Sequence, residues 1–198
     1  MPPSDSPRLT PPTNAITFHP LKTNKAYESN QPLHLEPHSE NHRYCSHRRC
    51  RRIRNPKLYV AMRTISLLIV HCSATPEGKS LSAEACRQDH IRHRGFRDIG
   101  YHFYITRDGK IHNGRPLEEP GAHCLHHNRH SIGICYEGRL DAEGHPKDTR
   151  TLAQRASLLA LLRELRRLFP QALIVGHHDL NPQKACPSFH CAREYIDL

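Results

Sequence analysis

Two short apolar runs, each ending at a histidine, constrain the fold of this chain more than any other feature of its sequence. The first is Ser66 to His71, and the second runs from Ala172 to Val175 and leads into Gly176-His177. Their length and their β-branched content are typical of strands that are buried on both faces, as in a parallel sheet covered by helices. We therefore expect both histidines to lie at strand ends of one sheet.

Helix and hairpin patterns separate these two runs. Ser82 to Arg94 is expected to form a helix that Ser82 caps and Gly95 ends. Gly100 to Thr106 and Ile111 to Asn113 flank an Arg-Asp-Gly-Lys turn and predict a hairpin, and Ser131 to Tyr136 is a further strand candidate.

The longest predicted element is an amphipathic helix from Thr151 to Phe169, with Thr151 and Gln154 as a capping box and Pro170 after its end. Its expected apolar stripe consists of Leu152, Ala156, Leu159, Leu162 and Leu165. Strands that alternate with helices in this way predict an α/β fold, with a central mixed β-sheet flanked by helices and a metal site at the strand ends.

The composition changes sharply near Met62. Residues 1–61 contain nine of the 16 prolines and none of the 10 glycines, and their apolar residues show no period. We predict a basic, disordered N-terminal extension over residues 1–61 and one domain over residues 62–198. Because Met62 also suits the start of such a domain, the extension is either a dispensable tail or an artefact of start-site assignment.

Charge and cysteine content limit the function classes. The formal net charge is +10, and six of these charges belong to residues 1–61, where the run Arg48 to Arg54 could contact nucleic acid or could simply be solvated. No aromatic residues accompany that run at a useful spacing, so we expect no specific nucleic-acid partner. We expect no transmembrane segment, no recognisable signal peptide, synthesis in the cytoplasm and eight reduced cysteines.

Three residues carry the chemistry that the strand ends suggest. His71, His177 and Cys186 offer two imidazoles and a thiolate, which are favoured zinc ligands, and three protein ligands leave the fourth tetrahedral position free for water. With 18 histidines in the chain, spacing alone leaves structural or solvated histidines open. His178 is an alternative ligand, although neighbouring side chains on a strand point to opposite faces.

At this point the chain resembles the type 2 N-acetylmuramoyl-L-alanine amidases, the family of phage lysozyme-type amidases and animal peptidoglycan recognition proteins. The resemblance covers nearly all of residues 64–195. Its landmarks are residues 70–75 (VHCSAT), 100–103 (GYHF), 107–109 (RDG), 114–116 (GRP), 122–123 (AH), Asn128 with residues 131–133 (SIG), and Gly176-His177 with residues 184–187 (KACP).

The resemblance implies a role for each matching position. It makes His71, His177 and Cys186 the ligands of one Zn²⁺ per chain, Tyr101 a catalytic-site hydroxyl, and Lys184 the cation beside the reacting carbonyl. It also implies that the polar residues His123, Asn128 and Ser131 contact the glycan or the stem peptide, although they could equally be ordinary loop residues.

The implied reaction is hydrolysis of the amide bond between the lactyl group of N-acetylmuramic acid and L-alanine, by a zinc-activated water. The partner would be peptidoglycan or a soluble muropeptide, and the protein is expected to be a monomer. The alternative is a peptidoglycan-binding module of the same superfamily that does not cut its ligand, and Cys186 argues against it, because members regarded as receptors have lost the thiolate ligand.

Overall fold

The structure is a computed structural model that describes residues 63–198. The predictions of disorder and of a basic run within residues 1–61 lie outside the described residues. In chain order the elements are β1 (Leu67–Cys72), β2 (Thr75–Pro76), α1 (Ala83–Arg94), β3 (Phe103–Ile105), β4 (Ile111–Asn113), the 3-10 helix η1 (Asn128–His130), β5 (Ser131–Tyr136), β6 (Arg139–Leu140), α2 (Leu152–Leu168), β7 (Leu173–Gly176), α3 (His177–Leu180) and α4 (Cys191–Glu194).

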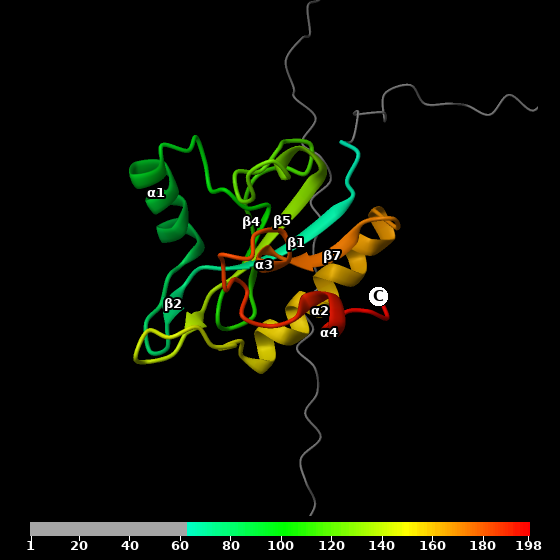
Figure 1. Ribbon diagram of the computed structural model, residues 1–198. Coiled ribbons are helices and arrows are strands. Elements are labelled where there is room, and N and C mark those ends of the chain that lie inside the picture. Colours follow the sequence, from blue (N-terminus) through cyan, green and yellow to red (C-terminus); the bar gives the residue numbers. More distant parts are fainter. Residues whose placement is uncertain (1–62) are drawn as a thin grey trace, which may run out of the picture. The chain divides into compact units, whose positions relative to one another are not determined.

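A five-stranded mixed sheet forms the centre of this fold, with the order β4-β3-β5-β1-β7 (Figure 1). Strand β1 lies between β5 and β7 and is parallel to both, with Leu67 opposite Ser131 on one side and Leu173 on the other. Strand β3 is parallel to β5, whereas β4 is antiparallel to β3 and completes the predicted hairpin. The predicted α/β class with a mixed central sheet is confirmed.

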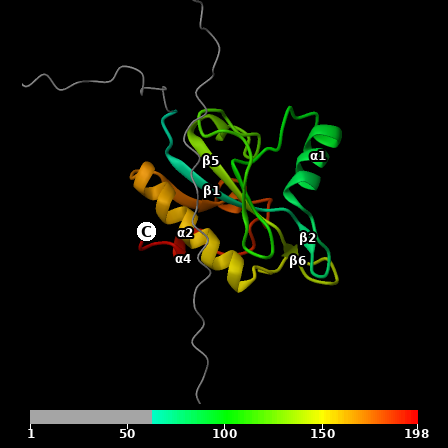
Figure 2. The same cartoon turned by 180° about the vertical axis from the view of Figure 1, so that it is seen from behind.

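Helices cover both faces of the sheet. Figures 1 and 2 show α1 on one side of the strands and α2 with α4 on the other. The larger core lies on the α2 side, where Leu68 and Val70 of β1 are fully buried in one cluster with Leu161 and Leu165. A smaller cluster on the α1 side contains Cys86, Ile99, Tyr104 and Cys135. Strand β1 is therefore buried on both faces, as its unbroken apolar sequence predicted.

Helix α2 forms where the sequence predicted it, but its buried face differs from the predicted stripe. The Thr151 side chain accepts a hydrogen bond from Gln154 N, and Gln154 accepts one from the Thr151 backbone N–H, so the predicted capping box is confirmed. The buried residues are Gln154, Leu158, Leu161, Leu162 and Leu165. The prediction was wrong for Leu152, which is 84% exposed, and for Ala156, which is also exposed.

Leu152 is exposed because polar groups anchor the first turn of α2. The Gln154 amide donates to Ile105 O at 3.1 Å and to Glu137 O at 2.8 Å, so the glutamine occupies the position that faces the sheet. Leu152 consequently points into solvent.

The limits of α1 are as predicted, because Ser82 caps its start and Gly95 ends it in the left-handed conformation.

Two further sequence predictions concern membranes and thiols. Among residues 63–198 there is no helix whose length and apolar character would allow it to span a membrane. The six cysteines of this region are unpaired and buried, as expected for reduced thiols, whereas Cys45 and Cys50 lie outside the described residues.

Candidate functional site

Strand β1 carries the first predicted ligand at its carboxyl end. The apolar residues before His71 pack into the sheet, and His71 itself is only 2% exposed. Because successive side chains of a strand alternate, Val70 and Cys72 join the large core while His71 faces the opposite side of the sheet. Its ring lies there beside Tyr101, with 5.3 Å between the ring centroids.

The second predicted ligand lies on a helix rather than on a strand. His177 is the first residue of α3, and Gly176, the last residue of β7, precedes that helix. The expectation that His177 closes a strand, with His178 on the opposite face for that reason, was therefore wrong. The Asp179 side chain accepts a hydrogen bond from Gly176 N at 2.7 Å, so the chain turns into α3 directly after β7.

Hydrogen bonds from β1, β5 and α3 fix the loop that carries Cys186. The Cys186 carbonyl accepts a hydrogen bond from His178 N at 2.7 Å, and the Cys186 Sγ accepts one from Cys72 N at 3.2 Å. The next residue is held too, because the Tyr136 hydroxyl donates to Pro187 O at 2.6 Å. A thiol brought from the end of the chain is thus placed against β1.

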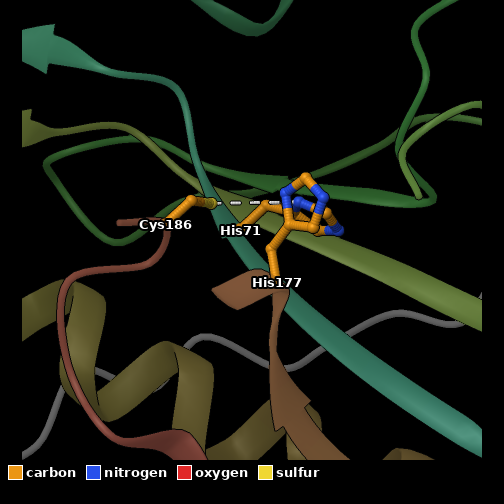
Figure 3. Close-up of side chains that lie close together, drawn as sticks. All are labelled: His71, His177 and Cys186. Atoms are coloured by element: carbon orange, nitrogen blue, oxygen red, sulfur yellow. Dashed lines mark hydrogen bonds between the residues drawn. The ribbon is translucent and has the colours of Figure 1, made fainter. Parts of the chain in front are cut away.

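The side chains of His71, His177 and Cys186 lie close together, as Figure 3 shows. Their ligand atoms all lie within 4.8 Å of one another. The Cys186 Sγ lies 3.9 Å from Nδ1 of His71, and the centroids of the His71 and His177 rings are 4.6 Å apart. Among residues 63–198 this is the one group of three or more His, Cys, Asp or Glu side chains that could hold a metal ion.

The protonation states suit metal binding. Interaction with the Cys72 side chain is the largest cause that lowers the pKa of the Cys186 thiol; the nearby His177 and His71 side chains lower it further, and burial opposes this. Burial lowers the pKa of His71, which keeps its imidazole neutral. A thiolate and neutral imidazoles are the forms in which these groups bind metals, so the donor set fits a zinc ion.

The two predicted catalytic residues differ in their surroundings. Tyr101 is partly buried, its ring lies against His71, and burial raises the pKa of its phenol well above the ordinary value, so the hydroxyl stays protonated. Lys184 is exposed and lies two residues before Cys186, and within residues 63–198 its ammonium makes no hydrogen bond or ion pair.

Of the three residues predicted to contact substrate, His123 lies next to His71, and Asn128 and Ser131 are linked to His123 by hydrogen bonds. His123 Nδ1 is 3.0 Å from Nε2 of His71, and His123 Nε2 is 3.4 Å from the Ser131 hydroxyl. The Asn128 side chain accepts from His123 N at 2.9 Å and from Cys124 N at 3.0 Å. Their contact with substrate stays a prediction.

Sequence reasoning missed two features of this region. It did not connect His123 with His71, because this contact between residues 52 positions apart depends on how the loop between β4 and η1 packs over Gly133 of β5. It also did not single out His102, which is 1% exposed and links Gly133 N to Glu119 O through its ring. His178, the alternative ligand, lies outside the cluster, and its Nε2 is 3.0 Å from Asp179.

Comparisons with known proteins give a consistent result. Residues 61–189 match the model of a family described as N-acetylmuramoyl-L-alanine amidase. The endolysin of Enterobacteria phage K11 is 42% identical over 128 residues, which are 65% of this chain and 83% of that protein. A peptidoglycan-recognition protein of Drosophila melanogaster is 35% identical over 146 residues, 71% of this chain and 76% of its own length.

A solved structure shows the same architecture. The N-acetylmuramoyl-L-alanine amidase LysC from Clostridium intestinale URNW superimposes with a TM-score of 0.56 at 28% sequence identity. The superposition covers 68% of this chain and 84% of the clostridial one.

Proposed function

The chain belongs to the N-acetylmuramoyl-L-alanine amidase family, and from this premise we propose that it hydrolyses peptidoglycan with a zinc ion held by His71, His177 and Cys186. The bond is the amide between the lactyl group of N-acetylmuramic acid and L-alanine. The observation that carries the proposal is the intact cluster of two imidazoles and a thiol, with all three ligand atoms within 4.8 Å of one another.

The number of ligands supports a catalytic site rather than a structural one. Structural zinc sites are closed by four protein ligands, whereas three ligands leave a position open for water or substrate. The chemistry that zinc supplies when bound is Lewis-acid activation of water and of an amide carbonyl near neutral pH. The chain itself contributes the position of the ligands, because strand β1, helix α3 and the Cys186 loop are each fixed by backbone hydrogen bonds.

Tyr101 and Lys184 are the residues that we assign to the reacting amide. The protonated phenol of Tyr101 beside His71 can donate a hydrogen bond to the attacking water or to the oxygen of the tetrahedral intermediate. Lys184 has an exposed ammonium on a flexible stem close to Cys186, which suits stabilisation of negative charge on that oxygen. Both residues act as hydrogen-bond donors to groups whose charge develops during the reaction.

Variants of these two residues test their roles. Loss of a donor that stabilises the oxyanion costs on the order of 10²–10³ in kcat, so Tyr101→Phe and Lys184→Met should lose activity by about this factor while their zinc content stays at one ion per chain. Lys79→Met is a matched control, because Lys79 is also exposed but belongs to the segment after β2. Wild-type kcat in either site variant would remove that residue from the mechanism.

The reaction itself is tested by the products. The protein is incubated with purified peptidoglycan, and released peptides are analysed by mass spectrometry for a free N-terminal L-alanine. Such peptides support the amidase. Binding to the wall without any release would favour the alternative, a peptidoglycan-binding module that does not cut, whereas release of sugars or of internal peptide fragments would show a different bond specificity.

The natural substrate is polymeric wall or soluble muropeptides, and relatives that carry the name endolysin favour the wall. We propose that the enzyme works as a monomer with one zinc ion, since all three ligands come from one chain. Sedimentation of the zinc-loaded protein checks this, and a stable dimer at assay concentration would contradict it.

A further inference from the structure

The two ring nitrogens of His71 have different neighbours. Nδ1 faces the ligand cluster, 3.9 Å from the Cys186 Sγ, whereas Nε2 lies 3.0 Å from Nδ1 of His123. A neutral imidazole that offers Nδ1 to a metal carries its proton on Nε2. With a metal at Nδ1, His71 therefore donates from Nε2, and His123 accepts at Nδ1.

The direction of the next two hydrogen bonds is consistent with this assignment. The Ser131 hydroxyl lies 2.7 Å from His127 O, a carbonyl that can only accept, so the hydroxyl proton is committed to that bond. The Ser131 oxygen is then free to accept from His123 Nε2, at 3.4 Å. A neutral His123 with its proton on Nε2 satisfies both neighbours, and the chain of donors ends on a backbone carbonyl.

The surroundings of His123 fix its ring in this orientation. A Cβ atom at Gly133 of β5 would lie 2.5 Å from the ring, and one at Gly121 would also collide with it, so two glycines leave the space that the ring fills. The Asn128 side chain holds the backbone N–H groups of His123 and Cys124. Both ring nitrogens of His123 thus have partners within the protein, and Gly121 and Gly133 pack against its ring.

We infer that His123 is a positioning residue for the metal ligand His71: it accepts the Nε2 proton of His71 and, with Ser131, sets the tautomer and ring orientation in which Nδ1 faces the metal. The inference rests on the proposed zinc site. Ligand histidines commonly donate their second N–H to an acceptor of this kind, and loss of the acceptor typically weakens metal binding about 10–100-fold. His123 thereby acts on the metal through His71 rather than on the substrate.

Three substitutions of His123 separate this role from the alternatives. Asparagine carries its carbonyl oxygen as many bonds from Cβ as Nδ1 of histidine, so His123→Asn can still accept from His71. Glutamine places its amide where Nε2 was, and phenylalanine keeps the ring volume without any acceptor. We expect zinc affinity, measured by competition with a chromophoric chelator in the absence of substrate, to fall about 10–100-fold in His123→Phe and His123→Gln, and far less in His123→Asn.

Each alternative gives another pattern. If His123 only filled space, His123→Phe would bind zinc like the wild type, and if it only contacted substrate, all three variants would keep wild-type zinc affinity and show a raised KM. Either result overturns the inference. His93→Phe, an exposed histidine of α1, is the control for removal of an imidazole and should bind zinc like the wild type.

Thermal denaturation of the metal-free variants shows whether they fold. If His123→Phe does not fold, the comparison of His123→Asn with His123→Gln decides the question, and equal zinc affinities would overturn the inference. The test also distinguishes failure of the positioning role of His123 from failure of the proposed function. Wild-type protein that binds no zinc would overturn both, whereas tight binding that is insensitive to all His123 variants would overturn the positioning role alone.

Discussion

At the scale of single residues, the surroundings of two of the predicted ligands, Cys186 and His71, suit them to a metal. The Cys186 sulfur accepts a backbone hydrogen bond from Cys72 N, and interaction with the Cys72 side chain lowers its pKa, which favours the thiolate form that binds a metal. Burial keeps His71 neutral. The three residues of the cluster could be predicted from residue types and from the family resemblance. The His71–His123 contact could not, because His123 belongs to the loop between β4 and η1, and the sequence does not show that this loop packs over Gly133 of β5 beside His71.

The thiolate should be indispensable. We predict that Cys186→Ser lowers zinc affinity by at least about 100-fold and abolishes hydrolysis, because a neutral hydroxyl is a far poorer zinc ligand than a thiolate. Zinc content after dialysis and peptide release measure the two effects. Cys86→Ala, which removes a buried thiol from the cluster on the α1 side of the sheet, is the control and should retain zinc. Full activity of Cys186→Ser with zinc bound would exclude Cys186 as a ligand.

His102 should make stability depend on pH. Burial lowers the pKa of His102 from 6.5 to about 4, so the unfolded chain binds more protons than the folded one between these values. Its contribution to the free energy of unfolding is fully present above pH 6.5, falls as the pH drops and is lost near pH 4. Between pH 7 and pH 5 it should decrease by about 2 kcal/mol.

The measurement is urea denaturation with a chelator present, at pH 7 and at pH 5, for the wild type and for His102→Gln. The destabilisation caused by the substitution should be larger at pH 7 than at pH 5, by roughly the same 2 kcal/mol. An equal destabilisation at both pH values would mean that His102 is not buried as a neutral group.

At the scale of helices and strands, local signals predicted most element limits. Ser82 and Gly95 bound α1, and the capping box at Thr151 starts α2. The apolar periodicity gave the wrong buried face for the first turn of α2. Two backbone carbonyls of neighbouring segments accept hydrogen bonds from Gln154 and hold it inward, so Leu152 points outward. The prediction that His177 ends a strand was also wrong, because β7 is followed directly by α3, and no polar linker marks the change in the sequence.

The observed face of α2 predicts unequal costs for two leucines. Leu162→Ala should lower the free energy of unfolding by about 2–5 kcal/mol, since this side chain is fully buried in the larger core and its removal leaves a cavity. Leu152→Ala is the matched control on the same helix and should change stability by less than about 0.5 kcal/mol. Chemical denaturation compares the two variants, and similar losses would show that the buried face has been misassigned.

At the scale of the whole molecule, the site exists because of strand order. The carboxyl ends of β1 and β7 are adjacent in a parallel pair, so His71 and the start of α3 come together although more than 100 residues separate them. Hydrophobic patterns predicted the strands and the α/β class, but they carry no information on which strands pair. The family resemblance implied the ligand set directly, so the ligands could be predicted without knowledge of the strand pairing.

The domain boundary near Met62 is a proposal about the whole chain. The described core and the metal cluster both lie within residues 63–198. We predict that a chain of residues 62–198 binds zinc and hydrolyses peptidoglycan at the rate of the full chain. Activity assays on both lengths check this, and a loss of more than a few-fold on truncation would show that residues 1–61 contribute to the enzyme.

The central claim is that three side chains hold a catalytic zinc ion, and its most direct test is metal removal and return. The full chain is treated with a chelator, dialysed, and assayed on peptidoglycan before and after addition of one equivalent of zinc. We predict that peptides beginning with L-alanine are released by the untreated protein, are absent after chelation, and reappear at one zinc ion per chain. Undiminished release from protein shown to contain no metal would contradict the claim.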